Sequence, residues 1–154
     1  MISLIFCIRL FDKHTQRWYP YLMEEYRRTK TTVSLINYHF VFCPRYRRKI
    51  FLNPFIDKRF KELVQEICGE HSFHILALET DKDHVHLFLN TPPKFSPTDI
   101  MAKIKGGTSK TIRDEFPELQ AMPSLWTRSY FVSTAGSVSS QTIKRYVETQ
   151  RTRS

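Results

Sequence analysis

The sequence predicts an α+β domain in which an antiparallel sheet carries helices on one face. Segments rich in β-branched and aromatic residues alternate with segments whose apolar residues recur at helical spacing. Their order along the chain is strand, helix, strand, strand, helix, strand. With 154 residues, 41% of them hydrophobic and only 4 glycines, the chain can form one domain with its own core, and the composition excludes a disordered protein.

Four segments have the composition of strands. Each is rich in aromatic and β-branched residues or alternates between apolar and polar ones. Asp81-Lys82-Asp83 separates the second segment from the third and is short enough for a hairpin turn. The four segments are residues 33–43, 73–80, 84–90 and 125–134.

Three segments have helical features. Pro54 opens the first helix, and Ser96-Pro97 combines a capping serine with a proline in the first turn of the second. Gly69 is the expected stop of the first helix, and Gly106-Gly107 is expected to loosen or bend the second. The segments are residues 54–69, 97–116 and 139–151. Together with the strands they predict a ferredoxin-like β-α-β-β-α-β arrangement, followed by a last helix, in which one sheet face stays open for a ligand or a partner.

The net charge indicates a polyanionic partner. The chain has 24 Lys and Arg against 15 Asp and Glu, a formal charge of +9. Such a field raises the local concentration of nucleic acid, and cations beside aromatic rings are typical of proteins that bind single strands. Clusters of this kind are YRRTK (26–30), RYRRKIF (45–51), KRFK (58–61), KIKGGTSK (103–110) and KRYVETQRTR (144–153).

Nothing in the sequence predicts a membrane or secreted protein. The apolar start MISLIFCIRLF is too short to span a bilayer and lacks the basic region and cleavage site of a signal peptide. Cys7, Cys43 and Cys68 are an odd set at unrelated spacings, which suits free thiols in a reducing cytosol. We therefore expect a cytoplasmic protein, associated with the nucleoid.

The stretch TDKDHVHLFLN (80–90) holds two histidines that share one side of a strand. Residues two apart in a strand point the same way, about 6.6 Å apart, so His84 and His86 project together. The intervening and following apolar residues face the helices, which leaves the histidines on the open face. There they are either two ligands of one metal ion or incidental polar residues of a half-exposed strand.

The last predicted helix adds a nucleophile and an amide on one face. Tyr146 and Gln150 are four residues apart and therefore neighbours on the helix surface, about 6 Å apart along its axis. A tyrosine hydroxyl can form a covalent intermediate, and an amide oxygen can complete the coordination of a metal ion. Taken alone, Tyr146 fits a core position beside Ile143 and Val147 better than a catalytic one.

The combination of motifs resembles a known family. DKDHVHLFL followed by TIKRYVETQ is similar to the His-hydrophobic-His and Tyr-x-x-x-Gln motifs of the single-tyrosine transposases of small insertion sequences, the IS200-like family, which transpose as single-stranded DNA. VSLINYHFVFCPRYRRKIF and LWTRSYFVSTAGSVS resemble the first strand of that family and its strand leading into the tyrosine helix. The resemblance runs from about Met23 to Gln150, so residues 23–154 are expected to form the transposase domain and 1–22 an upstream extension.

The resemblance implies a mechanism and a set of partners. His84, His86 and Gln150 would hold Mg²⁺ or Mn²⁺, and Tyr146 would attack a phosphodiester to give a 5′-phosphotyrosine and a free 3′-OH. The substrate would be single-stranded DNA with hairpins at the ends of the element. The enzyme would be a homodimer whose tyrosine helix acts on the histidine pair of the other subunit, with Gly136 as a hinge.

Supporting residues follow from the same resemblance and from charge. Asp83 is either a carboxylate that orients His84 or an ordinary turn acid, and His39 is assigned a structural role. Residues expected to hold the phosphates of a DNA hairpin are Arg45, Arg47, Arg48, Lys105 and Lys110. The alternatives are a domesticated relative or a replication-type nickase with the same chemistry, and a non-catalytic ferredoxin-like nucleic-acid binder.

Overall fold

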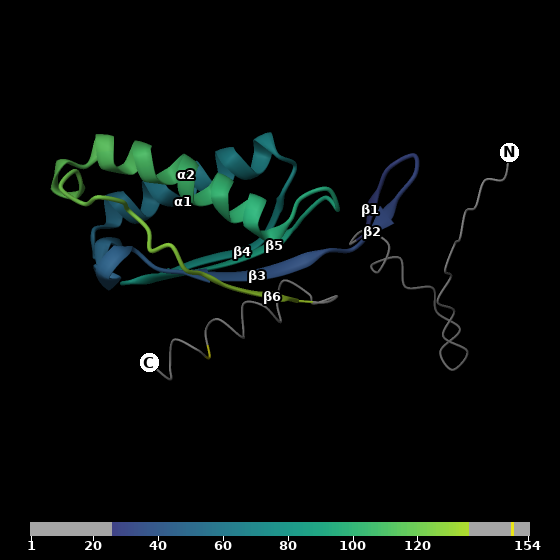
Figure 1. Ribbon diagram of the computed structural model, residues 1–154, viewed down its shortest axis with the longest axis horizontal. Coiled ribbons are helices and arrows are strands. Elements are labelled where there is room, and N and C mark those ends of the chain that lie inside the picture. The colour runs from purple at the N-terminus through teal and green to yellow at the C-terminus, as the bar shows by residue number, and fades with distance from the viewer. Residues whose placement is uncertain (1–25, 136–148, 150–154) are drawn as a thin grey trace, which may run out of the picture. The chain divides into compact units, whose positions relative to one another are not determined.

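The computed structural model describes residues 26–135 and 149. Residues 37–134 follow the expected order of strand, helix, strand, strand, helix, strand (Figure 1). The elements are β3 (Asn37–Phe42), α1 (Pro54–Glu70), β4 (His74–Asp81), β5 (His84–Asn90), α2 (Pro97–Glu115) and β6 (Phe131–Thr134). The four strands form one antiparallel sheet in the order β4-β5-β3-β6, which is the ferredoxin-like topology.

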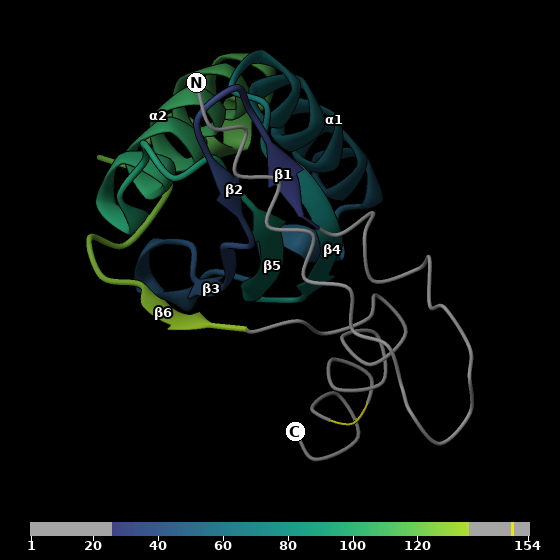
Figure 2. The same cartoon turned by 90° about the vertical axis from the view of Figure 1, so that its right-hand side faces the viewer.

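Both helices cover the same face of this sheet, as the view along the strands shows (Figure 2). The core between the layers is formed by apolar side chains that alternate along the central strands and recur along the helices. It includes Phe40 and Phe42 of β3, Val85, Leu87 and Leu89 of β5, Phe60 and Val64 of α1, and Ile100, Ile104 and Ile112 of α2. The opposite face of the sheet therefore carries the alternate residues of the same strands.

The helix starts agree with the sequence prediction. The Asn53 side chain caps α1 by accepting a hydrogen bond from the Phe55 amide at 3.0 Å, directly before Pro54. At α2, Ser96 and Asp99 form a capping box in which each side chain bonds to the other's backbone N–H. Both helices thus begin where local polar side chains satisfy their first amides.

Both helices continue through the glycines that were expected to stop or loosen them. α1 passes through Gly69 and ends at Glu70, and the left-handed residue beyond it is Ser72, with φ 58°. α2 runs without a break through Gly106 and Gly107. A Cβ at Gly107 would lie 2.6 Å from Cδ1 of Ile67, so this glycine permits the close approach of α1 and α2.

Two predicted strands are shorter than expected. The segment 33–43 divides into β2 (Val33–Ser34), which pairs with β1 (Arg27–Arg28) in a separate hairpin, and β3. Within 125–134 only β6 is a strand. The carbonyls of residues 127–129 accept hydrogen bonds from the Lys105 ammonium at 2.9–3.3 Å. Before them, Trp126 forms an isolated bridge with Pro44, and the Thr127 N–H bonds to the Cys43 carbonyl at 3.1 Å.

The predicted extension 1–22, the Gly136 hinge and the last helix lie outside the described residues, except that Thr149 is helical. Among the described residues, no helix is long and apolar enough to cross a membrane.

Candidate active site

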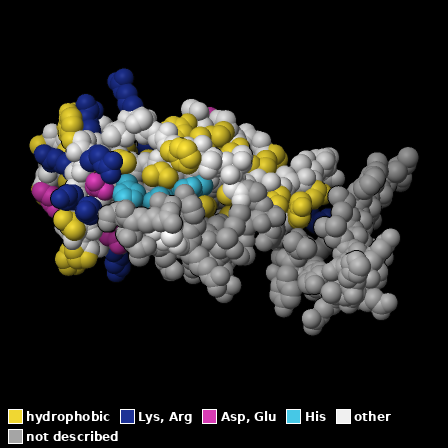
Figure 3. Space-filling model, turned by 90° about the horizontal axis from the view of Figure 1, so that it is seen from below, with side chains coloured by type: hydrophobic (Ala, Val, Ile, Leu, Met, Phe, Trp, Pro, Cys, Tyr) yellow, Lys and Arg dark blue, Asp and Glu magenta, His cyan; other side chains and the backbone are white. Residues whose placement is uncertain are grey.

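His84 and His86 lie together on the open face of the sheet, as their alternation in β5 predicts. Their ring centroids are 5.1 Å apart, with the rings nearly perpendicular at 74°. Val85 between them is fully buried under the helices. Figure 3 views the open face, where the histidine side chains lie beside a group of basic and acidic side chains. The strand period therefore brings two imidazoles to one place on the face that the helices leave uncovered.

Asp83 fixes the orientation of the His84 ring. Nδ1 of His84 donates to Oδ1 of Asp83 at 2.9 Å, and Nε of Arg47 donates to Oδ2 of the same carboxylate at 3.2 Å. The hydrogen bond from His84, followed by that from Arg47, lowers the pKa of Asp83. The carboxylate is therefore ionised near neutral pH, and with Nδ1 of His84 engaged, Nε2 is the nitrogen that this ring presents to a ligand.

His39 of β3 contacts the second histidine of the pair. Its Nε2 lies 3.1 Å from Nδ1 of His86, and its ring stacks on Phe88 at 4.0 Å with an interplanar angle of 4°. Burial, and secondarily the charge of His86, lowers the pKa of His39 to about 4, so this ring is neutral near pH 7. From sequence, His39 was assigned only a structural role, and its place beside the pair is the main feature that the sequence patterns missed. Its one local signal is that it alternates with core residues Phe40 and Phe42, which puts it on the open face.

Two neighbouring imidazoles are a ligand type that metal sites in proteins use. Two imidazoles on one face suit Mn²⁺ or Zn²⁺ better than the oxygen-preferring Mg²⁺. Within residues 26–135 and 149, no group of three or more His, Cys, Asp or Glu side chains is placed to hold a metal ion. The other two predicted members of the site, Gln150 and Tyr146, lie outside the described residues.

The arginines expected to hold DNA lie on the connection between β3 and α1. Arg47 is paired with Asp83 and therefore adjoins the histidine pair. Arg45 donates to the Ser124 hydroxyl at 3.0 Å and lies over the ring of Tyr46, while Arg48 is exposed. Tyr46 and Arg47 both adopt left-handed backbone conformations, with φ 60° and 49°. This uncommon geometry for residues with a Cβ turns the connection back toward the β4–β5 turn, where Phe51 N–H bonds to the Lys82 carbonyl at 3.3 Å.

The two lysines expected to hold DNA lie on α2, which covers the other face of the sheet. Lys105 uses its ammonium on the three carbonyls of residues 127–129, and burial lowers its pKa. Lys110 is exposed and pairs with Asp114 one turn later at 3.0 Å. The structure thus places the arginines at the histidine end of the sheet, whereas both lysines belong to the helix layer and have protein partners.

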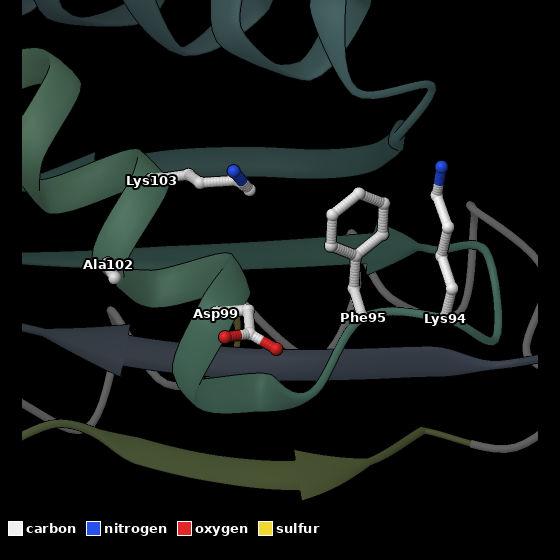
Figure 4. A pocket seen from close by; sticks show the side chains of 5 residues that line it. All are labelled: Lys94, Phe95, Asp99, Ala102 and Lys103. Carbon is white, nitrogen blue, oxygen red and sulfur yellow. The ribbon is translucent and has the colours of Figure 1, made fainter.

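An open cavity of about 490 Å³ lies beside the start of α2 (Figure 4). Phe95 stands between the ammonium groups of Lys94 and Lys103, which are 5.1 and 5.8 Å from its ring centroid. Asp99 also lines the cavity, but its carboxylate belongs to the α2 capping box. This hollow is on the helix side, and α2 follows the end of β5 opposite to His84, so it is separate from the histidine pair.

A family model described as "Transposase IS200 like" matches residues 32–150. The chain belongs to the IS200-like transposase family. The match contains the histidine pair and both predicted motif residues of the last helix. This membership makes the protein a DNA-processing enzyme of the transposase class, and it confirms the resemblance drawn from the motifs.

Individual proteins similar to this IS200-like transposase are also transposases. It is 32% identical over 118 residues to the transposase for insertion sequence element IS200 of Salmonella typhimurium, covering 73% of this chain and 75% of that protein. It is 25% identical over 135 residues to the ISDra2 transposase TnpA of Deinococcus radiodurans, covering 86% of this chain and 96% of that protein.

Solved structures confirm the fold of the transposase. A crystal structure of a putative transposase from Deinococcus radiodurans superposes with a TM-score of 0.66 and 26% identity, over 80% of this chain and 97% of that one. A REP-associated tyrosine transposase, solved with a REP hairpin, superposes with a TM-score of 0.53 at 15% identity, over 80% of this chain and 67% of that one. The second similarity concerns the fold alone.

Proposed function

We propose that this IS200-like transposase cleaves and rejoins single-stranded DNA through a covalent bond to Tyr146. The observation that carries the proposal is the histidine pair, with His84 and His86 side by side on the open sheet face and Nδ1 of each ring held by a neighbour. The family model continues through Tyr146 to Gln150, the two residues that would complete the site.

The covalent step is an exchange of phosphodiester bonds. The Tyr146 hydroxyl oxygen attacks phosphorus, the bond to the 3′ oxygen breaks, and the phenolic proton ends on the departing 3′-OH. The 5′-phosphotyrosine keeps the bond energy, so a 3′-OH of another strand can reverse the attack without ATP. His84, His86 and Gln150 would hold Mn²⁺ or Mg²⁺, which supplies charge neutralisation at the scissile phosphate.

Arg47 and Asp83 support this chemistry from the side of the histidines. Asp83 holds the proton of His84 on Nδ1, and Arg47 holds Asp83 from the other side. Arg45 and Arg48 lie on the same connection, so DNA phosphates bound there would pass close to the histidine pair. Of the two predicted lysines, Lys110 is exposed and would add a contact to the DNA, whereas the Lys105 ammonium is held by the carbonyls of residues 127–129. We expect the DNA to carry hairpins, as in the REP-hairpin complex of the structural relative.

The test is formation of a covalent protein–DNA adduct with hairpin-bearing single strands from the ends of the element, in Mn²⁺ or Mg²⁺. The wild type should form an adduct that denaturing gels resolve, and Tyr146→Phe should form none. His84→Ala and His86→Ala should abolish the adduct and leave hairpin binding largely intact. A non-catalytic nucleic-acid binder would bind the hairpin and give no adduct with any of these proteins.

The proposed homodimer acts in trans, with the tyrosine of one subunit at the histidine pair of its partner. A mixed dimer of Tyr146→Phe and His86→Ala subunits then contains one complete site. Mixing the two inactive proteins should restore adduct formation, with DNA attached only to the His86→Ala subunit, which a size tag identifies. A mixture that remains inactive, although subunit exchange is verified, would place both halves of the site in one subunit.

A further inference from the structure

We infer that His39 is a positioning residue that holds the ring proton of His86 on Nδ1 and so keeps Nε2 available as a metal ligand. The hydrogen bond is part of the described structure, whereas its use in metal binding rests on the proposed function. His39 does for His86 what Asp83 does for His84.

The strand register brings the two rings together. β3 and β5 are antiparallel, with His39 opposite Phe88 and Val41 opposite His86. His39 and His86 are therefore diagonal neighbours on the same sheet face, a spacing that long side chains bridge. Their ring centroids are 5.3 Å apart at an interplanar angle of 19°, and Nε2 of His39 lies 3.1 Å from Nδ1 of His86.

The His39 ring is held firmly enough to orient its neighbour. It is only 6% exposed and lies flat on the ring of Phe88. The edge of Phe131 from β6 approaches it at a centroid distance of 6.1 Å and an angle of 73°. Three neighbouring strands thus fix the position of a single ring nitrogen, which is the requirement for a group that orients a ligand.

The protonation pattern follows from the chemistry of imidazole. A neutral ring carries one N–H, so a nitrogen–nitrogen hydrogen bond has one donor and one acceptor. If His39 donated, the proton of neutral His86 would sit on Nε2 and block coordination there. If His86 donates from Nδ1, its Nε2 keeps a lone pair, which is the state that His84 reaches through Asp83. The second arrangement is the one that suits metal binding, because only it lets both rings present the same nitrogen.

The two ligands then differ in strength. An anionic carboxylate behind His84 makes that imidazole more basic than a neutral imidazole behind His86 does. His86 is therefore expected to be the weaker ligand of the pair, with the uncharged ring of His39 as the acceptor at its Nδ1. The loss of that acceptor should affect metal affinity without removing any atom that touches the metal.

The first test reads the tautomer directly, by long-range ¹H–¹⁵N correlation spectra of the histidine rings in the full, metal-free protein at pH 7.5. His86 should show a protonated Nδ1 and an unprotonated Nε2. In His39→Phe, which keeps an aromatic ring on Phe88 but has no acceptor, the proton should move largely to Nε2. A wild-type His86 protonated on Nε2 would overturn the inference.

The second test measures Mn²⁺ affinity by titration calorimetry. His39→Phe should weaken binding about 10-fold or more, and His39→Gln, whose amide oxygen can accept from Nδ1, should recover most of it. His71→Phe is the control, because His71 lies near Phe73 and Phe95, away from the pair, and should leave the affinity unchanged.

The outcomes separate this inference from the proposed function. Equal affinity in wild type and His39→Phe, or no recovery in a folded His39→Gln protein, contradicts the positioning role. If the wild type binds no Mn²⁺ but His86 shows the expected tautomer, the hydrogen-bond assignment stands and the metal-dependent function fails.

Discussion

Oδ1 of Asp83 lies 2.9 Å from Nδ1 of His84, so the residue that ends the β4–β5 turn also orients the first residue of β5. The sequence left Asp83 between a turn acid and an orienting carboxylate, and the contact shows that one side chain does both. The conformation of the β4–β5 turn therefore affects the orientation of His84, the proposed metal ligand.

Replacing Asp83 by Asn should weaken Mn²⁺ binding about 10-fold, because the amide still accepts the His84 proton but carries no charge. Asp83→Ala should cost more, since Nδ1 of His84 then loses its acceptor. Calorimetric titration measures both. The matched control is Asp114→Asn, which removes an exposed carboxylate that pairs with Lys110 on α2. Equal affinities for wild type and Asp83→Ala would contradict the orienting role.

The stability of the fold should fall in mild acid because of His39. Its pKa is about 4 in the folded protein against 6.5 for the free side chain, so the unfolded chain binds this proton more tightly. The stabilisation is complete above about pH 6.5 and is lost as the pH falls toward 4, by on the order of 1–3 kcal/mol. Urea unfolding of His39→Phe should show a shallower fall over this range. A slope equal to that of the wild type would contradict the assignment.

Gly106 and Gly107 should respond differently to alanine. Nothing lies within 4 Å of a Cβ at Gly106, so Gly106→Ala should raise the free energy of unfolding by about 0.5–1 kcal/mol through helix propensity alone. Gly107→Ala should raise the free energy of unfolding by less, or lower it, because its Cβ would meet Cδ1 of Ile67 at 2.6 Å. Adding Ile67→Val, which removes that methyl group, should reduce the difference. An equal rise in the free energy of unfolding for both variants would show that Ile67 or the helices shift to accommodate the new methyl group without loss of stability.

The aromatic core should depend on Phe60. This fully buried ring lies among Phe42, Phe51 and Trp126 at centroid distances of 5.2–6.3 Å. Phe60→Ala should cost about 3–5 kcal/mol in urea unfolding. Phe55→Ala, on the same helix but 73% exposed, should stay within about 0.5 kcal/mol of the wild type. A small effect at Phe60 would mean that the core closes over the cavity.

Arg48 and Lys105 should separate DNA binding from folding. Arg48 is exposed on the connection beside the histidines, so Arg48→Ala should weaken hairpin binding and reduce the slope of log affinity against log salt by about 1. Lys105→Met should instead lower the melting temperature, because the carbonyls of residues 127–129 lose their donor. A changed salt slope with unchanged melting for Lys105→Met would make it a phosphate contact.

Local patterns predicted much of the fold and half of the candidate site. The strand period placed His84 and His86 on the open face, and Pro54 and Ser96-Pro97 marked where the helices begin. These features depend on residues that are close in sequence. The contact between His39 and His86 depends on the register of β3 against β5, which no local pattern contains.

The same limit explains the incorrect details. Trp126 is a residue type that is common in strands. In the structure it is buried in the core and belongs to an isolated bridge with Pro44, outside the named strands. Lys105, from a different part of the chain, takes the carbonyls that follow. Gly107 resembles a helix breaker until its distance to Ile67 on α1 is known. Each of these outcomes was decided by a partner distant in sequence.

The alternation of β5 couples correct strand pairing to exposure of the histidine pair. Val85, Leu87 and Leu89 are all at 0% exposure, so a slip of one residue would turn them to solvent and turn both histidines into the core. A misassembled copy would therefore have no imidazoles to offer to a metal ion or to DNA. For an enzyme whose proposed task is to cut DNA, this arrangement means that only correctly folded copies expose the histidines that cleavage requires.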